Sequence, residues 1–148
     1  MSANTFLFAW NPVKWPWPEI GEAAAKKKKG KKVTDSWNCV SYTKVQPGDR
    51  AFFVRLGSEP RGIFASGRIT SEPFPCTGRK GQPIHCVKVE FDTLLDPATM
   101  PILTLDILRI GPLEKQTWTP QSSGIRIRPE LVDELEAVWQ DFLENGAE

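Results

Sequence analysis

The stretch Pro47–Pro73, PGDRAFFVRLGSEPRGIFASGRITSEP, decides the fold of the chain, because its pattern is that of two strands joined by a turn. Arg50–Leu56 is a nearly unbroken run of aromatic and branched apolar residues, as expected of a strand buried on both faces. Gly62–Ile69 has a short apolar centre flanked by glycines and predicts the second strand. The turn residues of Gly57–Arg61 separate the two. We therefore expect this pair of strands at the centre of a sheet.

The glycine inside the second strand indicates a special position. Glycine weakens a strand because it has no side chain to pack, so it usually marks a bulge or a place where another backbone or a ligand comes close. The pair Ser66-Gly67 is therefore our first candidate for the wall of a pocket.

The length and composition predict one soluble domain over residues 1–148. The net charge of +1 does not indicate a class of partner. No apolar run approaches the roughly 18 residues of a membrane span, and the N-terminus lacks a secretion signal. Cys39, Cys76 and Cys86 are too few, and odd in number, for a disulfide scaffold. We therefore expect a cytoplasmic protein with no membrane partner.

Outside the central pair, apolar patterns predict further strands and one long helix. Strands are expected at Asn4–Trp10, Ile84–Phe91 and Ile125–Ile127, and a strand followed by a helical turn at Ile102–Leu108. From Pro129, the stripe of Leu131, Leu135, Val138 and Phe142 predicts an amphipathic helix that ends near Asn145-Gly146. The expected fold class is α+β, a small, mostly antiparallel β-barrel with short flanking helices and a C-terminal helix.

Three other segments predict irregular structure. Thr34–Lys44 begins with helix-capping residues and predicts a single helical turn before an irregular segment. Phe74–Gln82 is rich in glycine, proline and polar residues and predicts a loop. Trp15 and Trp17 stand in the proline-rich stretch Val13–Pro18, where we expect them to cover one end of the core.

Six of the seven residues from Lys26 to Lys32 are lysine. A block of like charge repels itself, so the sequence predicts a mobile, solvated loop. Such a loop either only raises solubility or contacts phosphate groups, and the polar and aromatic segments around it favour the second interpretation. The candidate contacts to a nucleic-acid backbone are Lys26, Lys27, Lys28, Lys29, Lys31, Lys32, Gln121, Ser122 and Ser123.

The sequence offers no convincing catalytic or metal-binding constellation. His85 is the only histidine, and it stands inside a predicted strand, where a structural role is expected. Cys39, Cys76, His85 and Cys86 have poor spacing for zinc, because no CxxC pair occurs. No phosphate-binding loop or dinucleotide fingerprint is present. We therefore expect a non-enzymatic domain without a metal or cofactor.

The remaining candidates for a functional site are aromatic and small polar residues on predicted loops. Aromatic faces stack on flat rings, amides hydrogen-bond to base edges and lysines neutralise phosphate. An enzyme or reader that extrudes a base from its helix needs this combination. The candidate base-pocket residues are Trp10, Asn11, Trp37, Asn38, Ser66 and Trp118.

Four segments together resemble an EVE-type domain of the PUA superfamily. They are FLFAWNP (6–12), DSWNCV (35–40), the central stretch 47–73 and WTPQSSGIRI (118–127). The pattern is similar to the versions found in modification-dependent restriction endonucleases that carry an HNH nuclease domain, and the order of elements also resembles the YTH domain. The resemblance implies a PUA-like fold with an aromatic slot beside the barrel, in which Trp37 is a cage residue, Asn11 hydrogen-bonds the base edge and Trp118 is a partner.

Some family features are absent from this chain. WNCVSYTK stands where free-standing EVE domains have WxGVRNYQARN, and Pro73–Gln82 contains no second cage tryptophan of the YTH kind. No HNH motif occurs, so a nuclease would be fused to this chain or associated with it. The resemblance implies a reader of 5-methylcytosine, or a related base, in DNA. The alternatives are a reader of modified or structured RNA and a protein-interaction or small-ligand module.

Overall fold

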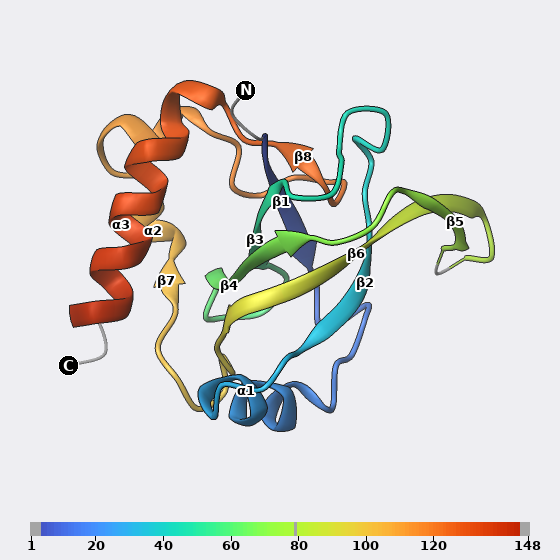
Figure 1. The fold of residues 1–148 in the computed structure, drawn as a ribbon. Helices are drawn as coiled ribbons and strands as arrows, with labels where there is room; N and C mark the ends of the chain where they lie inside the picture. The colour runs from blue at the N-terminus through green and yellow to red at the C-terminus, as the bar shows by residue number, and fades with distance from the viewer. Residues whose placement is uncertain (1–3, 79, 146–148) are drawn as a thin grey trace.

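The computed structural model of the chain describes residues 4–78 and 80–145. A mixed sheet curls into a half-barrel with short helices and a C-terminal helix against it (Figure 1). The strands are β1 (Thr5–Trp10), β2 (Thr34–Asn38), β3 (Arg50–Arg55), β4 (Gly62–Ile69), β5 (Phe74–Thr77), β6 (Pro83–Leu94), β7 (Leu103–Thr104) and β8 (Ile125–Arg126). The helices are α1 (Ile20–Lys28), α2 (Leu105–Leu108), α3 (Val132–Asn145) and the 3-10 helices η1 (Gly111–Lys115) and η2 (Pro129–Leu131). The expected fold class is confirmed.

The central strand pair lies where the sequence predicts it. The sheet order is β2-β6-β4-β3-β1-β8, so that β3 and β4 are its middle strands. They pair antiparallel, with a register shift between Phe53 and Val54, while β1 runs parallel to β3. The two strands carry the most apolar runs of the chain because both of their faces are covered.

Strand β6 pairs with two segments for which the sequence predicts a helical turn and a loop instead of strands. Cys86 of β6 is paired with Asn38 of β2 on one side and with Phe74 of β5 on the other. The predictions of a helical turn in Thr34–Lys44 and of a loop throughout Phe74–Gln82 were therefore wrong. Both segments are short and polar, and they become strands only because β6 offers them free backbone donors and acceptors.

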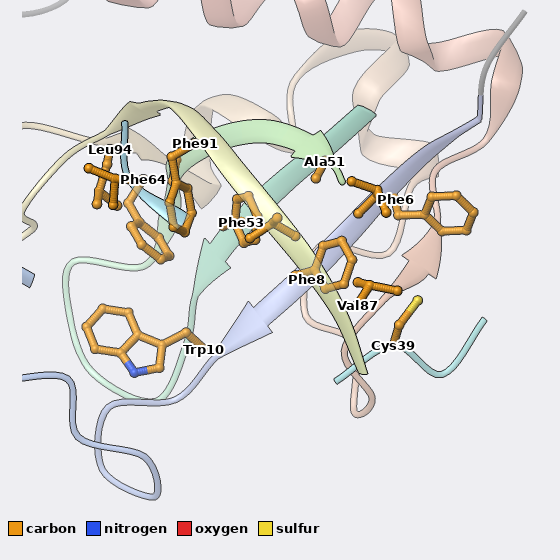
Figure 2. Packing of buried hydrophobic residues seen from close by; sticks show 14 of the residues in the cluster. Phe6, Phe8, Trp10, Cys39, Ala51, Phe53, Phe64, Val87, Phe91 and Leu94 are labelled. Carbon is orange, nitrogen blue, oxygen red and sulfur yellow. The ribbon is translucent and has the colours of Figure 1, made fainter. Parts of the chain in front are cut away.

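The two faces of the sheet bury two separate hydrophobic clusters. Along β1, Phe6, Phe8 and Trp10 point into the barrel (Figure 2), whereas the intervening Leu7 points to the outside. The inner cluster also contains Phe53, Phe64, Val87, Val89 and Phe91. The outer cluster joins Leu7 to Phe52, Val54, Trp118, Leu135 and Trp139 beneath α3. Each candidate site residue therefore belongs to one side of the sheet or the other.

Backbone hydrogen bonds join the segment after β2 to the segment before β8. Val40 N donates to Ser123 O over 2.8 Å, and Gly124 N donates to Leu7 O over 2.9 Å. Gly124 has a φ of +85°, and an added Cβ would lie 2.6 Å from Cys39 Cα, so that only glycine fits. We call this junction, made of residues 39–41, residues 121–124 and the end of β1, the barrel seam.

Helix α3 packs on the outer face of the sheet through the predicted apolar stripe and through one further residue that the prediction did not include. Leu135 is fully buried and Phe142 is partly buried, but the largest buried side chain is Trp139. Its Nε1 donates to Ser66 Oγ over 3.0 Å. The helix ends at Asn145, as predicted, while Gly146 lies outside the described residues. No helix among the described residues has the length and apolar character needed to span a membrane.

A charged network ties β3 to β6 and α3. Arg50 forms a two-point ion pair with Glu136 through Nε at 2.8 Å and Nη2 at 3.2 Å, and it also pairs with Asp92. Asp92 in turn accepts a hydrogen bond from Ser66 Oγ. Burial alone would lower the pKa of the Arg50 guanidinium, but the two carboxylates raise it above its ordinary value. Arg50 therefore links β3, β6 and α3 through its ion pairs.

We expect Arg50→Met to lower the free energy of unfolding by about 2 kcal/mol, because it leaves Asp92 and Glu136 without their cation. Both carboxylates are partly exposed, so the loss stays below that of a fully buried pair. Urea unfolding followed by circular dichroism measures the change. Arg68→Met is the control, since Arg68 is exposed and bonds only to a backbone carbonyl. Equal losses in the two variants would show that the network does not stabilise the fold.

Candidate nucleic-acid interface

The lysine run is helical as far as Lys28. Lys26, Lys27 and Lys28 form the last turn of α1, and Gly30 after it has a φ of +80°. The prediction of a loop was therefore wrong for Lys26, Lys27 and Lys28, because lysine is a good helix former and its charge is favourable at a helix C-terminus. Lys31 and Lys32 follow the helix, and Lys32 lies 3.8 Å from Glu90. The lysines are thus presented from a fixed element beside the N-terminal end of β2 (Figure 1).

Trp37 enters the inner cluster from β2. Its ring centroid lies 5.0 Å from that of Phe53, 6.3 Å from that of Phe8 and 6.1 Å from that of Trp17. Trp17 in turn lies 5.7 Å from Trp10. We call these five residues the aromatic cluster. The expectation that both tryptophans cover one end of the core is confirmed for Trp17, which packs against the buried cluster from the loop before α1. It was wrong for Trp15, which is 53% exposed.

Trp37 has a polar group that the fold leaves without a partner. Its Nε1 is buried, and no acceptor among the described residues is within hydrogen-bond reach. The neighbouring Trp10 contrasts with it, because its Nε1 donates to Trp15 O over 2.6 Å. A buried N–H without an acceptor costs about 1–3 kcal/mol, so its presence in a native fold calls for an explanation.

The aromatic slot is not an open hole. Trp17 packs against both Trp10 and Trp37, and its ring meets each of theirs edge to face. A cavity of about 430 Å³ lies elsewhere, between α1 and the C-terminal part of α3, and one of about 440 Å³ lies over β2 and β6. A flat ligand would therefore take the place of Trp17 rather than enter an empty slot.

The two asparagines lie at the margins of the cluster. Asn11 directly follows Trp10, and its Oδ1 accepts a hydrogen bond from Val13 N over 3.0 Å. An added Cβ on Gly57 would lie 2.3 Å from Asn11 Oδ1, so the side chain is seated against the turn after β3. Asn38 is exposed on the face of β2 opposite to Trp37.

The prediction that Ser66 and Trp118 line the base pocket is wrong, because neither belongs to the aromatic cluster. Ser66 is fully buried on the outer face, between Trp139 and Asp92. Trp118 is buried in the outer cluster, where its Nε1 donates to Leu113 O over 2.8 Å. The sheet lies between both residues and Trp37, so a base stacked on Trp37 would not reach them. The close approach that Gly67 indicates is made by the backbone of β6, since an added Cβ would lie 2.3 Å from Glu90 O.

The polar loop before β8 lies at the barrel seam. Ser123 Oγ accepts a hydrogen bond from Ala9 N over 3.0 Å, and Gln121 and Ser122 are exposed beside it. Ser123 thereby contacts both β1, which ends in Trp10, and Val40, three residues after Trp37. The fold brings together three of the segments on which the family resemblance depends, although they are far apart in the sequence.

Sequence reasoning did not single out Arg55. Its guanidinium carbon lies 5.7 Å from the centroid of the Trp10 ring, and its Nε is buried without an acceptor among the described residues. Arg55 pairs with Trp10 across the parallel strands β3 and β1. An arginine that closes an otherwise apolar strand was the available signal.

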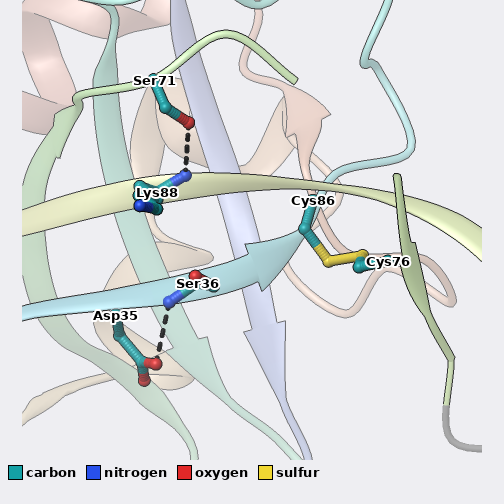
Figure 3. The surroundings of a disulfide bond; sticks show 6 residues. All are labelled: Asp35, Ser36, Ser71, Cys76, Cys86 and Lys88. Atoms are coloured by element: carbon teal, nitrogen blue, oxygen red, sulfur yellow. Dashed lines mark hydrogen bonds between the residues drawn. A yellow bond between two sulfur atoms is a disulfide. The ribbon is translucent and has the colours of Figure 1, made fainter. Parts of the chain in front are cut away.

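The cysteines do not form a metal site in the described part of the chain. Cys76 and Cys86 form a disulfide between β5 and β6 (Figure 3), which the sequence analysis did not anticipate. Cys39 is a buried free thiol, and among the described residues no group of histidine, cysteine and carboxylate side chains suits a metal ion. Burial raises the pKa of the Cys39 thiol to about 11, and the charge of Asp49 adds to the effect.

We expect Cys39 to resist alkylation in the folded protein at pH 8, because its reactive thiolate is scarce and buried. Without reductant, iodoacetamide and mass spectrometry should find no modified cysteine in the folded state and one in urea. With reductant in urea, all three cysteines should be modified. Rapid alkylation of Cys39 in the folded protein would contradict the expected burial. Modification of all three cysteines in urea without reductant would contradict the disulfide.

Comparison with solved structures identifies the fold. A hypothetical protein from Leishmania major superposes with a TM-score of 0.65 and 17% identity, over 95% of this chain and 96% of the other. A protein from Rhodopseudomonas palustris gives 0.63 and 20%, over 93% and 94%. Human THYN1, solved in complex with DNA that contains 5-methylcytosine, gives 0.62 and 16%, over 93% and 98%. No family model and no curated protein matches the sequence. The chain therefore has the same fold as the DUF55 domain of human thymocyte nuclear protein 1.

Proposed function

We propose that this chain is an EVE-type, non-enzymatic domain that binds DNA and recognises 5-methylcytosine, or a related modified base, by extruding it from the helix. The observation that carries the proposal is the buried, unpartnered indole N–H of Trp37 inside a cluster of flat rings at the barrel seam. A base supplies a flat ring in place of Trp17 and the acceptor that the Trp37 N–H lacks. The fold shared with THYN1, whose structure contains methylated DNA, is the second support.

The extruded base would displace Trp17. Trp17 is only partly buried and stands on the loop between β1 and α1, whereas Trp37 is held in β2 by its neighbours in β6. When Trp17 swings out, the base stacks between Trp10 and Trp37, and Asn11, which directly follows Trp10, turns from Val13 N to bond the base edge. The lysines of α1 and the loop after it neutralise the phosphates, so the affinity falls as salt rises.

The free energies of base extrusion and stacking predict only a modest preference for the methylated base over the plain one. Unstacking a base costs a few kcal/mol, and each base–aromatic stack returns about 1–3 kcal/mol. One buried methyl group adds only about 0.8 kcal/mol. Because binding alone separates substrates that differ by one methyl group only weakly, we expect a preference of roughly tenfold to a few hundredfold.

The biological setting is also a proposal. A reader with this preference suits a cytoplasmic modification-dependent restriction system, in which a fused or associated HNH nuclease cuts the DNA that the reader selects. RNA with a modified base offers the same chemistry to the pocket. A competition between modified RNA and modified DNA of the same sequence decides between the two.

The test is a titration of one duplex in two forms, with and without a single 5-methylcytosine, at fixed salt. We expect the methylated duplex to bind at least tenfold more tightly. A duplex with 2-aminopurine opposite or beside the methylated base reports extrusion by its fluorescence. Equal affinities for the two duplexes would overturn the proposal, and so would a preference without extrusion.

A further inference from the structure

A second aromatic site lies on the surface near the barrel seam. The rings of Tyr42 and His85 are stacked nearly parallel, with their centroids 3.6 Å apart and an angle of 9° between their planes. Tyr42 is 41% exposed, so one side chain of the pair remains accessible to solvent. Exposed parallel rings of this kind are surfaces on which a nucleobase stacks.

One ring of the stack is held on a strand, whereas Tyr42 stands in the turn after β2. His85 stands in β6, where its carbonyl accepts a hydrogen bond from Cys39 N over 2.9 Å and its backbone pairs with Pro75 of β5. The next residue, Cys86, is bonded to Cys76 by the disulfide (Figure 3). His85 is therefore a firmly held support for Tyr42, and a ring that packs on it loses less freedom when a ligand binds, which favours affinity.

The stack also lies next to the proposed base site. Asn38, the neighbour of Trp37, is paired with Cys86, which directly follows His85. Between Asn38 and Tyr42, the exposed Val40 is bonded through its backbone to Ser123 of the seam. The backbone around the Tyr42–His85 pair is therefore tied both to the strand that carries Trp37 and to the barrel seam.

We propose that the Tyr42–His85 pair is a stacking platform for the base that neighbours the extruded one. The inference rests on the proposed function, because the platform needs a nucleic acid at the seam. Once a base leaves the helix, its neighbour loses a stacking partner, and the exposed ring of Tyr42 replaces that partner. His85 acts behind Tyr42 and fixes the ring, so that it is a positioning residue.

The sequence makes this proposal directly measurable. Tyr42 is the only tyrosine and His85 the only histidine, so each gives a unique aromatic NMR signal. The probe is the duplex with a single 5-methylcytosine, added to the full chain. We expect ring-current shifts of both signals at saturation. Unchanged signals on a protein that binds the duplex and extrudes its base would overturn the platform and leave the proposed function intact.

Variants separate stacking from packing. Tyr42→Ala should weaken binding of the methylated duplex about tenfold, whereas Tyr42→Phe should restore the affinity because it keeps the ring. Ile107→Ala is the control, since Ile107 is 48% exposed on α2 and belongs to no proposed site. The ratio of methylated to plain affinity should not change with Tyr42, because Trp37 sets it. Equal affinities of Tyr42→Ala and the unmodified chain would overturn the inference, whereas a ratio near one for the unmodified chain would instead remove the proposed function.

Discussion

Trp37→Ala is expected to lower the free energy of unfolding by about 3 kcal/mol, although Trp37 is partly exposed. The substitution removes an indole that packs against Phe53, Phe8 and Trp17, and the rigid strands around it cannot close the space. Urea unfolding measures the loss. Trp15→Ala is the matched control, because Trp15 is 53% exposed and bonds through its backbone only. Similar stabilities of the two variants would show that Trp37 does not belong to the core.

The same packing determines which variant tests base recognition. Loss of binding in Trp37→Ala would combine a folding defect with a missing contact, so Trp37→Phe is the better test. Phenylalanine keeps one ring in the cluster. It removes the N–H, which has no partner in the described residues, together with the second ring of the indole. We expect Trp37→Phe to stay folded, to bind the methylated duplex about tenfold more weakly and to keep its affinity for plain duplex. An unchanged preference for the methylated duplex would contradict the role of this N–H.

Gly67→Ala is expected to lower the free energy of unfolding by about 3 kcal/mol. Its Cβ would lie 2.3 Å from Glu90 O and 3.0 Å from Phe91 Cα, so β4 and β6 would have to separate. Both contacts are backbone atoms of a paired strand, which cannot move aside as a flexible side chain can. The position coincides with a register shift between Ser66 and Gly67, where the two strands come unusually close.

The control for this prediction is the same substitution in a helix. Gly21 lies in α1, and its Cβ would meet only the carboxylate end of Asp96 at 3.2 Å, which can turn away. Gly21→Ala should therefore raise the stability by up to about 1 kcal/mol, because alanine favours the helix. Thermal unfolding of both variants measures whether each substitution raises or lowers the stability. A loss at Gly21 as large as the loss at Gly67 would show that the strand contact is not the cause.

The local pattern of the sequence was sufficient for the elements that carry their own signal. The apolar run of Arg50–Leu56 and the glycine-flanked run of Gly62–Ile69 became β3 and β4 almost without change. Strict alternation along Ile84–Phe91 also accounts for the buried face of Val87, Val89 and Phe91, since it assigns neighbouring residues to opposite faces. Alternation does not reveal on which of the two buried faces of the sheet a residue lies.

That choice explains the errors in the candidate site. Trp118 and Ser66 have the residue types of a base pocket, but the sheet directs both to the outer cluster beneath α3. Trp17 had been assigned a covering role only, yet it packs against both Trp10 and Trp37, in the position that a base would need. Residue type and order along the chain do not contain this information, because the face of a residue depends on which strands pair and how they curl.

The sequence by itself determined the strands of the central pair, the C-terminal helix and the set of aromatic residues available to a ligand, because these follow from short-range periodicity and side-chain chemistry. Only the tertiary structure decided that β2 and β5 are strands, that Cys76 meets Cys86, and that Ser123 meets both β1 and Val40 at the barrel seam. The reason is that each of these features depends on backbone pairing with β6 or β1, between segments that are distant in the sequence, and such pairing leaves no local mark on the residues that it joins.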